Sequence, residues 1–212
     1  MNRKKQKLIE IFLMTFFFLI FAILFQLQSF IIVLLFVTSI VISLCFKNEI
    51  IKNILPQKKN YFLYFIFFDI FLVVSMIAFF GNDLFVYKLD FSNYFFILIL
   101  LLFYLFFSVI PQELIFRFFF FHRYTNFFNK NELLLVNSLA FSLCHVIYFD
   151  IYIFLFSFLG NLLFTLNYMR NKSLLLVIIE HFLIGQTLII LGFFDNFNLS
   201  LTKKLYNLVL IN

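Results

Sequence analysis

Tryptophan is absent from this chain of 212 residues, which also has only four glycines, two prolines and two cysteines. Without tryptophan, the ten tyrosines must supply the aromatic side chains that favour a membrane–water interface. Cys45 and Cys144 lie far apart and form no CxxC pair, which argues against a disulfide framework. Because helix breakers are scarce and no internal repeat is visible, the paired broken helices of a transporter are not expected.

Charged residues are also scarce. They make up 12% of the chain, whereas 65% of it is hydrophobic and the mean hydropathy is +1.08. A soluble domain of this size could not bury so much apolar surface. The apolar runs are continuous and show no alternation, which excludes transmembrane β-strands. We therefore predict an all-α, polytopic membrane helical bundle that forms a single membrane domain over residues 1–212 and contacts lipid.

About seven apolar segments are long enough to cross a bilayer, which needs roughly 20 residues for each span. They cover residues 8–25, 29–46, 61–80, 93–110, 133–149, 151–169 and 173–192. The fourth segment runs on through a polar motif that begins at Pro111. Because proline suits the first turn of a helix, we expect a new helix or a kink to begin there.

The basic residues lie between the apolar segments, so the net charge of +6 indicates topology and not a nucleic-acid partner. They gather before the first span, in the loop near 47–60, after the fourth span and between the sixth and seventh spans. These four places share one side if seven spans alternate, and the positive-inside rule then puts the N-terminus in the cytoplasm.

The abundance of Phe, Ile, Asn and Lys is typical of an AT-rich genome, so we expect a bacterial inner or plasma membrane.

Ionisable side chains recur at membrane depth, where each is costly and by default indicates a functional site. Glu113 and Arg117 follow Pro111 at a spacing that places them on one helix face. His145 lies in the fifth span, and Glu180 and His181 lie in the seventh. Taken singly, Arg117 could merely neutralise Glu113, and a lone histidine could be a contact between helices. Together they predict one polar site.

Two chemistries suit this set of side chains. Imidazoles and carboxylates bind divalent metals, and a zinc ion held by His145, His181 and Glu113 is one expectation. A metal-free site is the other, in which a desolvated carboxylate activates a water molecule. The residue types alone leave both open.

The polar segments resemble the motifs of the CPBP family of intramembrane proteases, which are CAAX-protease-like and associated with bacteriocin immunity. That family has EExxxR, FxxxH and HxxxN or HxxxD on successive membrane helices. This chain has the variant QExxxR from Gln112 to Arg117, then FxxxH from Phe141 to His145, and EHxxxG from Glu180 to Gly185. The resemblance implies a catalytic-like core over about residues 93–192.

The resemblance implies an intramembrane endopeptidase that cleaves membrane-associated peptides or proteins by water activation. Glu113 or Glu180, aided by His145, would deprotonate the water. His181 would stabilise the oxyanion or bind a metal, Gln112 would position the water or the substrate, and Arg117 would orient Glu113. The substrates would be prenylated CAAX proteins in a eukaryote, and another membrane-anchored or bacteriocin-related peptide in a bacterium.

Two departures from the family pattern favour an alternative. Gln112 replaces the glutamate that the family uses to activate water, and Gly185 replaces the Asn or Asp that helps to hold an oxyanion. A member altered in this way could be catalytically inactive and act as a membrane binding, immunity or scaffold protein. The two histidines, Arg117 and one motif glutamate are all present, so we favour the enzyme.

Overall fold

The described part of the chain is built from helices and contains no strand. The computed structural model describes residues 2–24, 28–55, 59–80 and 94–190. Outside one long central helix, its α-helices are α1 (Arg3–Leu24), α2 (Gln28–Cys45), α3 (Lys47–Ile54), α4 (Lys59–Phe80), α8 (Lys130–Cys144), α9 (Ile151–Asn171) and α10 (Leu174–Ile190). The prediction of an all-α membrane bundle is confirmed.

Each predicted span corresponds to a helix of the structure, although the number of crossings stays a prediction. Among the described residues, three helices are long and apolar enough to cross a membrane, over Leu98–Tyr124, Lys130–Tyr148 and Ile151–Asn171. A fourth crossing results if Ile31–Cys45 and Lys47–Ile54, which meet at 97°, form one bent span. The protein is an integral membrane protein. Its extent as one domain over residues 1–212 also stays a prediction.

The central helix runs without a break from Tyr94 to Tyr124, so no separate helix begins at Pro111. The alternative, a kink at Pro111, stays a prediction. Its successive parts are α5 (Tyr94–Tyr104), the π-helical turn η1 (Leu105–Val109), α6 (Ile110–Glu113), the π-helical turn η2 (Leu114–Phe119) and α7 (Phe120–Tyr124). In the first wide turn the Ile110 amide donates to the Leu105 carbonyl. Wide turns absorb the hydrogen bond that proline cannot make, and they occur often at functional sites.

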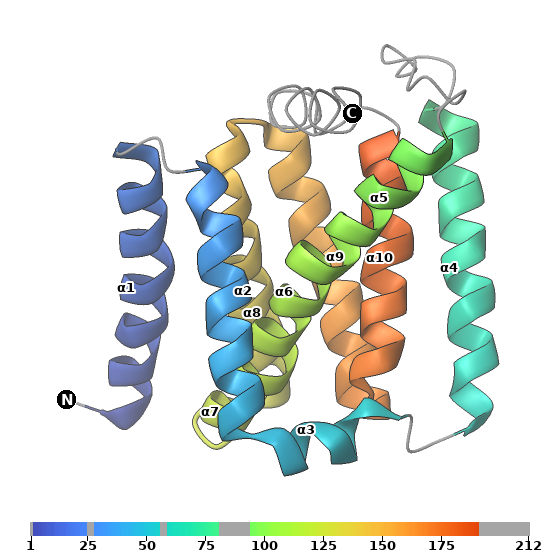
Figure 1. Cartoon of the computed structure of the whole chain (residues 1–212). Helices are drawn as coiled ribbons and strands as arrows, with labels where there is room; N and C mark the ends of the chain where they lie inside the picture. Colours follow the sequence, from blue (N-terminus) through green and yellow to red (C-terminus); the bar gives the residue numbers. More distant parts are fainter. Residues whose placement is uncertain (1, 25–27, 56–58, 81–93, 191–212) are drawn as a thin grey trace.

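The helices pack around this central helix, which crosses obliquely in front of α8, α9 and α10 (Figure 1). Helix α10 contacts α4, α9 and the central helix, and α8 packs along α9. Helix α2 covers another side of the central helix, while α1 packs against α8. The outer helices α1, α2 and α4 expose many large apolar side chains, as expected for surfaces that face lipid instead of water.

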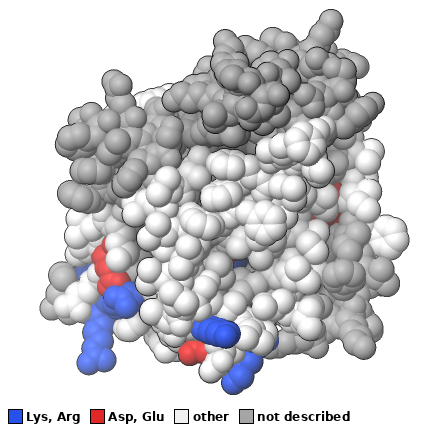
Figure 2. Space-filling model, in the orientation of Figure 1, with Lys and Arg blue, Asp and Glu red and all other residues white. Residues whose placement is uncertain are grey.

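The N-terminus, α3, α7 and the connection from α9 to α10 lie at one end of the bundle (Figure 1). Most of the visible Lys and Arg side chains gather at that end (Figure 2). Ion pairs link these segments, with Glu10 bound to Arg123 and Lys4 bound to Glu132. The four basic places therefore share one side, as predicted. A cytoplasmic N-terminus remains a prediction.

Helix α3 lies within the stretch that the sequence predicts as a loop over residues 47–60, so that prediction is wrong for Lys47–Ile54. None of its residues is buried. Its C-terminal end is held by Ser173, whose hydroxyl donates to the Ile54 carbonyl at 2.9 Å. A short helix of this kind, turned sharply from α2 at the basic end, suits a place along the membrane interface.

Candidate active site

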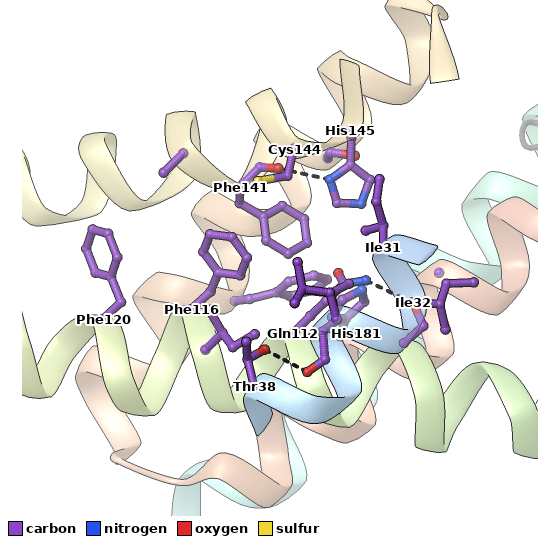
Figure 3. A pocket seen from close by; sticks show the side chains of 18 of the residues that line it. Ile31, Ile32, Thr38, Gln112, Phe116, Phe120, Phe141, Cys144, His145 and His181 are labelled. Carbon is purple, nitrogen blue, oxygen red and sulfur yellow. Dashed lines mark hydrogen bonds between the residues drawn. The ribbon is translucent and has the colours of Figure 1, made fainter. Parts of the chain in front are cut away.

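The three polar motifs converge on one cavity of about 810 Å³ inside the bundle. Gln112 of α6, His145 at the end of α8 and His181 of α10 all line it. Figure 3 shows these side chains with Phe141 between the two histidines. Segments far apart in the sequence thus bring an amide and two imidazoles to a largely apolar hollow. The structure therefore brings together three of the six predicted catalytic side chains at the cavity wall.

Glu113 lies behind this wall and connects two of the motifs. Its side chain is wholly buried and does not line the cavity. One carboxylate oxygen, Oε1, lies 2.7 Å from Nδ1 of His181. The other, Oε2, forms an ion pair with Nε of Arg117 at 3.1 Å, outside the angles of a hydrogen bond. Its burial places Glu113 in contact with the histidine and not at the cavity wall. Its predicted role, as one of two glutamates that could deprotonate water, stays a prediction.

Arg117 is held by neutral polar side chains of α8 and α9. Its guanidinium donates from Nη1 to Asn137 Oδ1 at 3.0 Å and from Nη2 to Asn161 Oδ1 at 2.6 Å. The two amides are themselves fixed, because Asn137 donates to the Phe116 carbonyl and Asn161 donates to Asn137. A buried charge needs several such partners to offset the water that it has lost. The predicted role of Arg117, to orient Glu113, stays a prediction.

Aromatic rings enclose the charged pair. The Arg117 guanidinium lies 5.9 Å from the ring centre of Phe141 and 5.7 Å from that of Phe164, distances at which a cation is attracted by a ring face. Phe164 also stacks on His181, with ring centres 5.0 Å apart. The Phe141 ring contacts His145 at 4.6 Å and His181 at 5.7 Å. Phe141 therefore holds both imidazoles and the guanidinium in fixed relation.

The two histidines are oriented in the same way, although by different partners. Nδ1 of His145 lies 2.9 Å from the Phe141 carbonyl, which can only accept, so Nδ1 carries the proton. Nδ1 of His181 faces the Glu113 carboxylate, and an ionised carboxylate likewise only accepts. In neutral rings this leaves Nε2 of each histidine with a free lone pair. Each imidazole can thus serve as a base toward the cavity.

Glu180 is not part of this group, although the sequence predicted a catalytic role for it. It precedes His181 by one residue, and adjacent side chains of an α-helix differ in direction by roughly 100°. Its carboxyl group meets Asn167 of α9 and Asp69 of α4, and it does not line the cavity. The structure thus pairs Glu180 with Asp69, a second carboxyl group that is only 2% exposed.

The predicted metal set is not assembled in this arrangement. Among the described residues, no group of three or more His, Cys, Asp or Glu side chains lies close enough to hold a metal ion. Glu113 already binds His181 and Arg117, and His145 projects from a different helix. The residues as arranged therefore do not fit a zinc ion held by His145, His181 and Glu113. The expectation of zinc stays a prediction.

Several polar side chains of the site were missed in the sequence. They are Asn137, Ser138 and Thr165, which hydrogen-bond with Asn161 around the guanidinium, and Asp69 and Asn167, which surround Glu180. All are buried in apolar helices. Glu113 and His181 were predicted because they are polar groups at membrane depth. The same criterion identifies these residues if it includes amides and hydroxyls and extends to α4.

A comparison with protein families gives a match over the same part of the chain. Residues 94–185 match the model of a family described as type II CAAX prenyl endopeptidase Rce1-like. The predicted family resemblance is confirmed. The Rce1-like stretch includes the central helix, α8, α9 and His181, and it supports a protease of the CAAX kind. No curated protein and no solved structure gives a significant match to the chain.

Removal of the buried cation should destabilise the bundle strongly. We expect Arg117→Ala to lower the free energy of unfolding by about 3–5 kcal/mol, because Glu113 is left as a buried charge without its partner. The exposed control Arg123→Ala should cost about 1 kcal/mol or less. Denaturant unfolding in detergent, followed by circular dichroism, measures both. Equal losses in the two variants would contradict the structural importance of the buried pair.

Proposed function

We propose that this protein is an intramembrane endopeptidase in which the Glu113–His181 pair activates water. The observation that carries the proposal is the 2.7 Å contact between the Glu113 carboxylate and Nδ1 of a histidine that lines the cavity. A carboxylate in this position fixes the tautomer of the ring and stabilises the imidazolium that forms when the ring takes a proton. The Rce1-like match supports the same class of reaction.

The reaction begins with a water molecule between His181 and the carbonyl carbon of the peptide bond. Nε2 of His181 takes a proton from the water as its oxygen bonds to that carbon, which gives a tetrahedral oxyanion. When the C–N bond breaks, the imidazolium returns the proton to the leaving amine. Glu113 stays ionised throughout, held by Arg117. His145 accepts a hydrogen bond from the attacking water and so fixes its direction.

Gln112 binds at the same wall. Its amide nitrogen donates to the Ser108 hydroxyl at 2.9 Å, and its Oε1 has no hydrogen-bond partner in the described part of the chain. Buried acceptors are normally satisfied, so this oxygen suits a water molecule or a substrate N–H. A positioning role for Gln112 therefore replaces the carboxylate chemistry of the family motif.

The substrate is a membrane-associated peptide or protein. The cavity is large and its wall is mostly apolar, with aromatic side chains from the central helix and α8, which suits an apolar segment or a lipid-modified residue. The family description names CAAX prenyl endopeptidases, so a prenylated CAAX peptide is the first probe. An apolar peptide without a prenyl group is the second, for the case of a bacterial membrane.

Removal of the imidazoles should abolish cleavage. We expect His181→Ala and His145→Ala to lower turnover of an internally quenched farnesylated CAAX peptide or of an unprenylated apolar peptide by about 10²–10⁴-fold, the usual contribution of general base catalysis. The protein would be purified in detergent and the cut identified by mass spectrometry. His122→Ala is the matched control, since that exposed histidine pairs with Glu49 outside the cavity. Unchanged turnover in both cavity variants would rule the proposal out.

The two motif glutamates should differ in their importance. Glu180→Gln should keep turnover within a few-fold of the wild type, because an amide can still accept from Asn167 and donate to Asp69. Glu113→Gln should lose about 10²-fold or more, because the imidazolium of His181 then has no carboxylate beside it. The same peptide assay compares these two isosteric changes. A larger loss of turnover for Glu180→Gln than for Glu113→Gln would contradict the proposal that Glu113, and not Glu180, assists His181.

A second candidate function is binding without cleavage, as an immunity or scaffold protein. It is favoured by one observation: none of the described residues that line the cavity is Asp or Glu. The site would then hold a peptide or partner helix in an apolar hollow, with Gln112 as a hydrogen-bonding group.

The variant Gln112→Glu separates the two functions. If His181 is the base, the wild type cleaves and the added carboxylate changes turnover by less than about tenfold. If the wild type lacks a base, Gln112→Glu should increase cleavage by about 10²-fold or more, the size of a general base contribution. Peptide turnover of wild type and variant, with Gln112→Met as a control for the loss of the amide, decides between them.

A further inference from the structure

Gly185 leaves a gap in the wall of the cavity, and a side chain from another helix fills that gap. It lies one turn after His181 on α10 and lines the same cavity. A Cβ atom at this position would lie 1.9 Å from the hydroxyl oxygen of Tyr104 and 2.9 Å from its Cζ. Any other residue would therefore clash with the phenol ring. The Tyr104 hydroxyl occupies the space that a side chain at position 185 would take.

Packing from α10 fixes the direction of the Tyr104 ring. It lies edge-on to His181, with ring centres 6.4 Å apart and planes at 81°. It also stacks on Phe182, at 6.1 Å and 26°. Tyr104 is the last residue of α5 and is followed at once by the first wide turn of the central helix. Its hydroxyl is thus held at a defined place beside His181.

Tyr104 lines the cavity together with His181, and no hydrogen bond joins its hydroxyl to another of the described residues. Buried tyrosine hydroxyls usually find a partner. A phenol O–H that packing orients beside the cavity is available to a group that enters it. Because Tyr104 lies beside His181, the group next to its hydroxyl would be the peptide bond on which His181 acts.

We propose that Tyr104 is a catalytic residue that donates a hydrogen bond to the carbonyl oxygen of the peptide bond being cleaved. This inference rests on the proposed protease function. As the water oxygen bonds to the carbonyl carbon and His181 takes the proton, negative charge develops on the carbonyl oxygen. The Tyr104 O–H stabilises that charge without transferring its own proton. When the C–N bond breaks, the carbonyl reforms and the hydrogen bond weakens.

The pairing of Tyr104 with Gly185 gives the proposal a second consequence. The family resemblance implies an Asn or Asp at position 185, and this chain has no side chain there. The donor group is instead supplied from α5, in the volume left free by glycine. The two positions should therefore be interchangeable: a donor on either helix serves, but both cannot fit together.

The first test is Tyr104→Phe, which removes the hydroxyl and keeps the ring that fills the gap. We expect kcat for the quenched peptide to fall by about 10²–10³-fold, as for loss of one oxyanion donor, while KM stays within twofold. The thermal midpoint in detergent should not change, which separates this result from a structural role. Tyr152→Phe removes a hydroxyl from an exposed site on α9 and should leave turnover unchanged.

The second test moves the donor to α10. Tyr104→Ala should lose activity. The double variant Tyr104→Ala with Gly185→Asn should have a turnover at least tenfold higher than that of Tyr104→Ala alone. Gly185→Asn alone should lose activity because of the clash with Tyr104. If His181→Ala abolishes cleavage but Tyr104→Phe does not alter kcat, the inference fails and the protease proposal stands. If the wild type cleaves neither peptide, the protease proposal fails and the inference fails with it.

Discussion

The contact between Glu113 and Arg117 is the constraint on which the rest of the structure depends. Both side chains are wholly buried within a bundle that faces lipid. An unpaired charge there is costly, because no water hydrates it. The pair alone leaves most of its hydrogen-bonding groups unused. The carboxylate therefore reaches His181 on α10, and the guanidinium reaches amides on α8 and α9. A single pair on the central helix thus ties together the helices that carry every motif.

The same arrangement divides the polar groups into two sets on either side of α10. His181 faces the cavity with Gln112 and His145, whereas Glu180 faces α4 and shares Asp69 and Asn167. The helical turn between neighbouring residues is enough to produce this division. A histidine that touches both a buried carboxylate and an open hollow is therefore the link between the charged core and any bound substrate. Tyr104 completes the wall at the one place where α10 has no side chain.

Much of the fold and part of the site could be predicted from the sequence. The apolar runs located the helices, because a lipid-facing helix needs a continuous run of such residues. Membrane depth alone brought His145 and His181 together correctly. The side chain direction of Glu180 could not be predicted, since the sequence shows its depth but not the rotation of its helix. The form in which the central helix passes Pro111 could not be predicted, because local propensity does not indicate the two wide turns on either side of it.

The anchor of Arg117 consists of amides and hydroxyls, from Asn137, Asn161 and Thr165. Groups of this kind neither gain nor lose protons under the conditions in which proteins fold. Arg117 therefore keeps these partners whatever the acidity of the solution, and they add no further charge to the apolar interior.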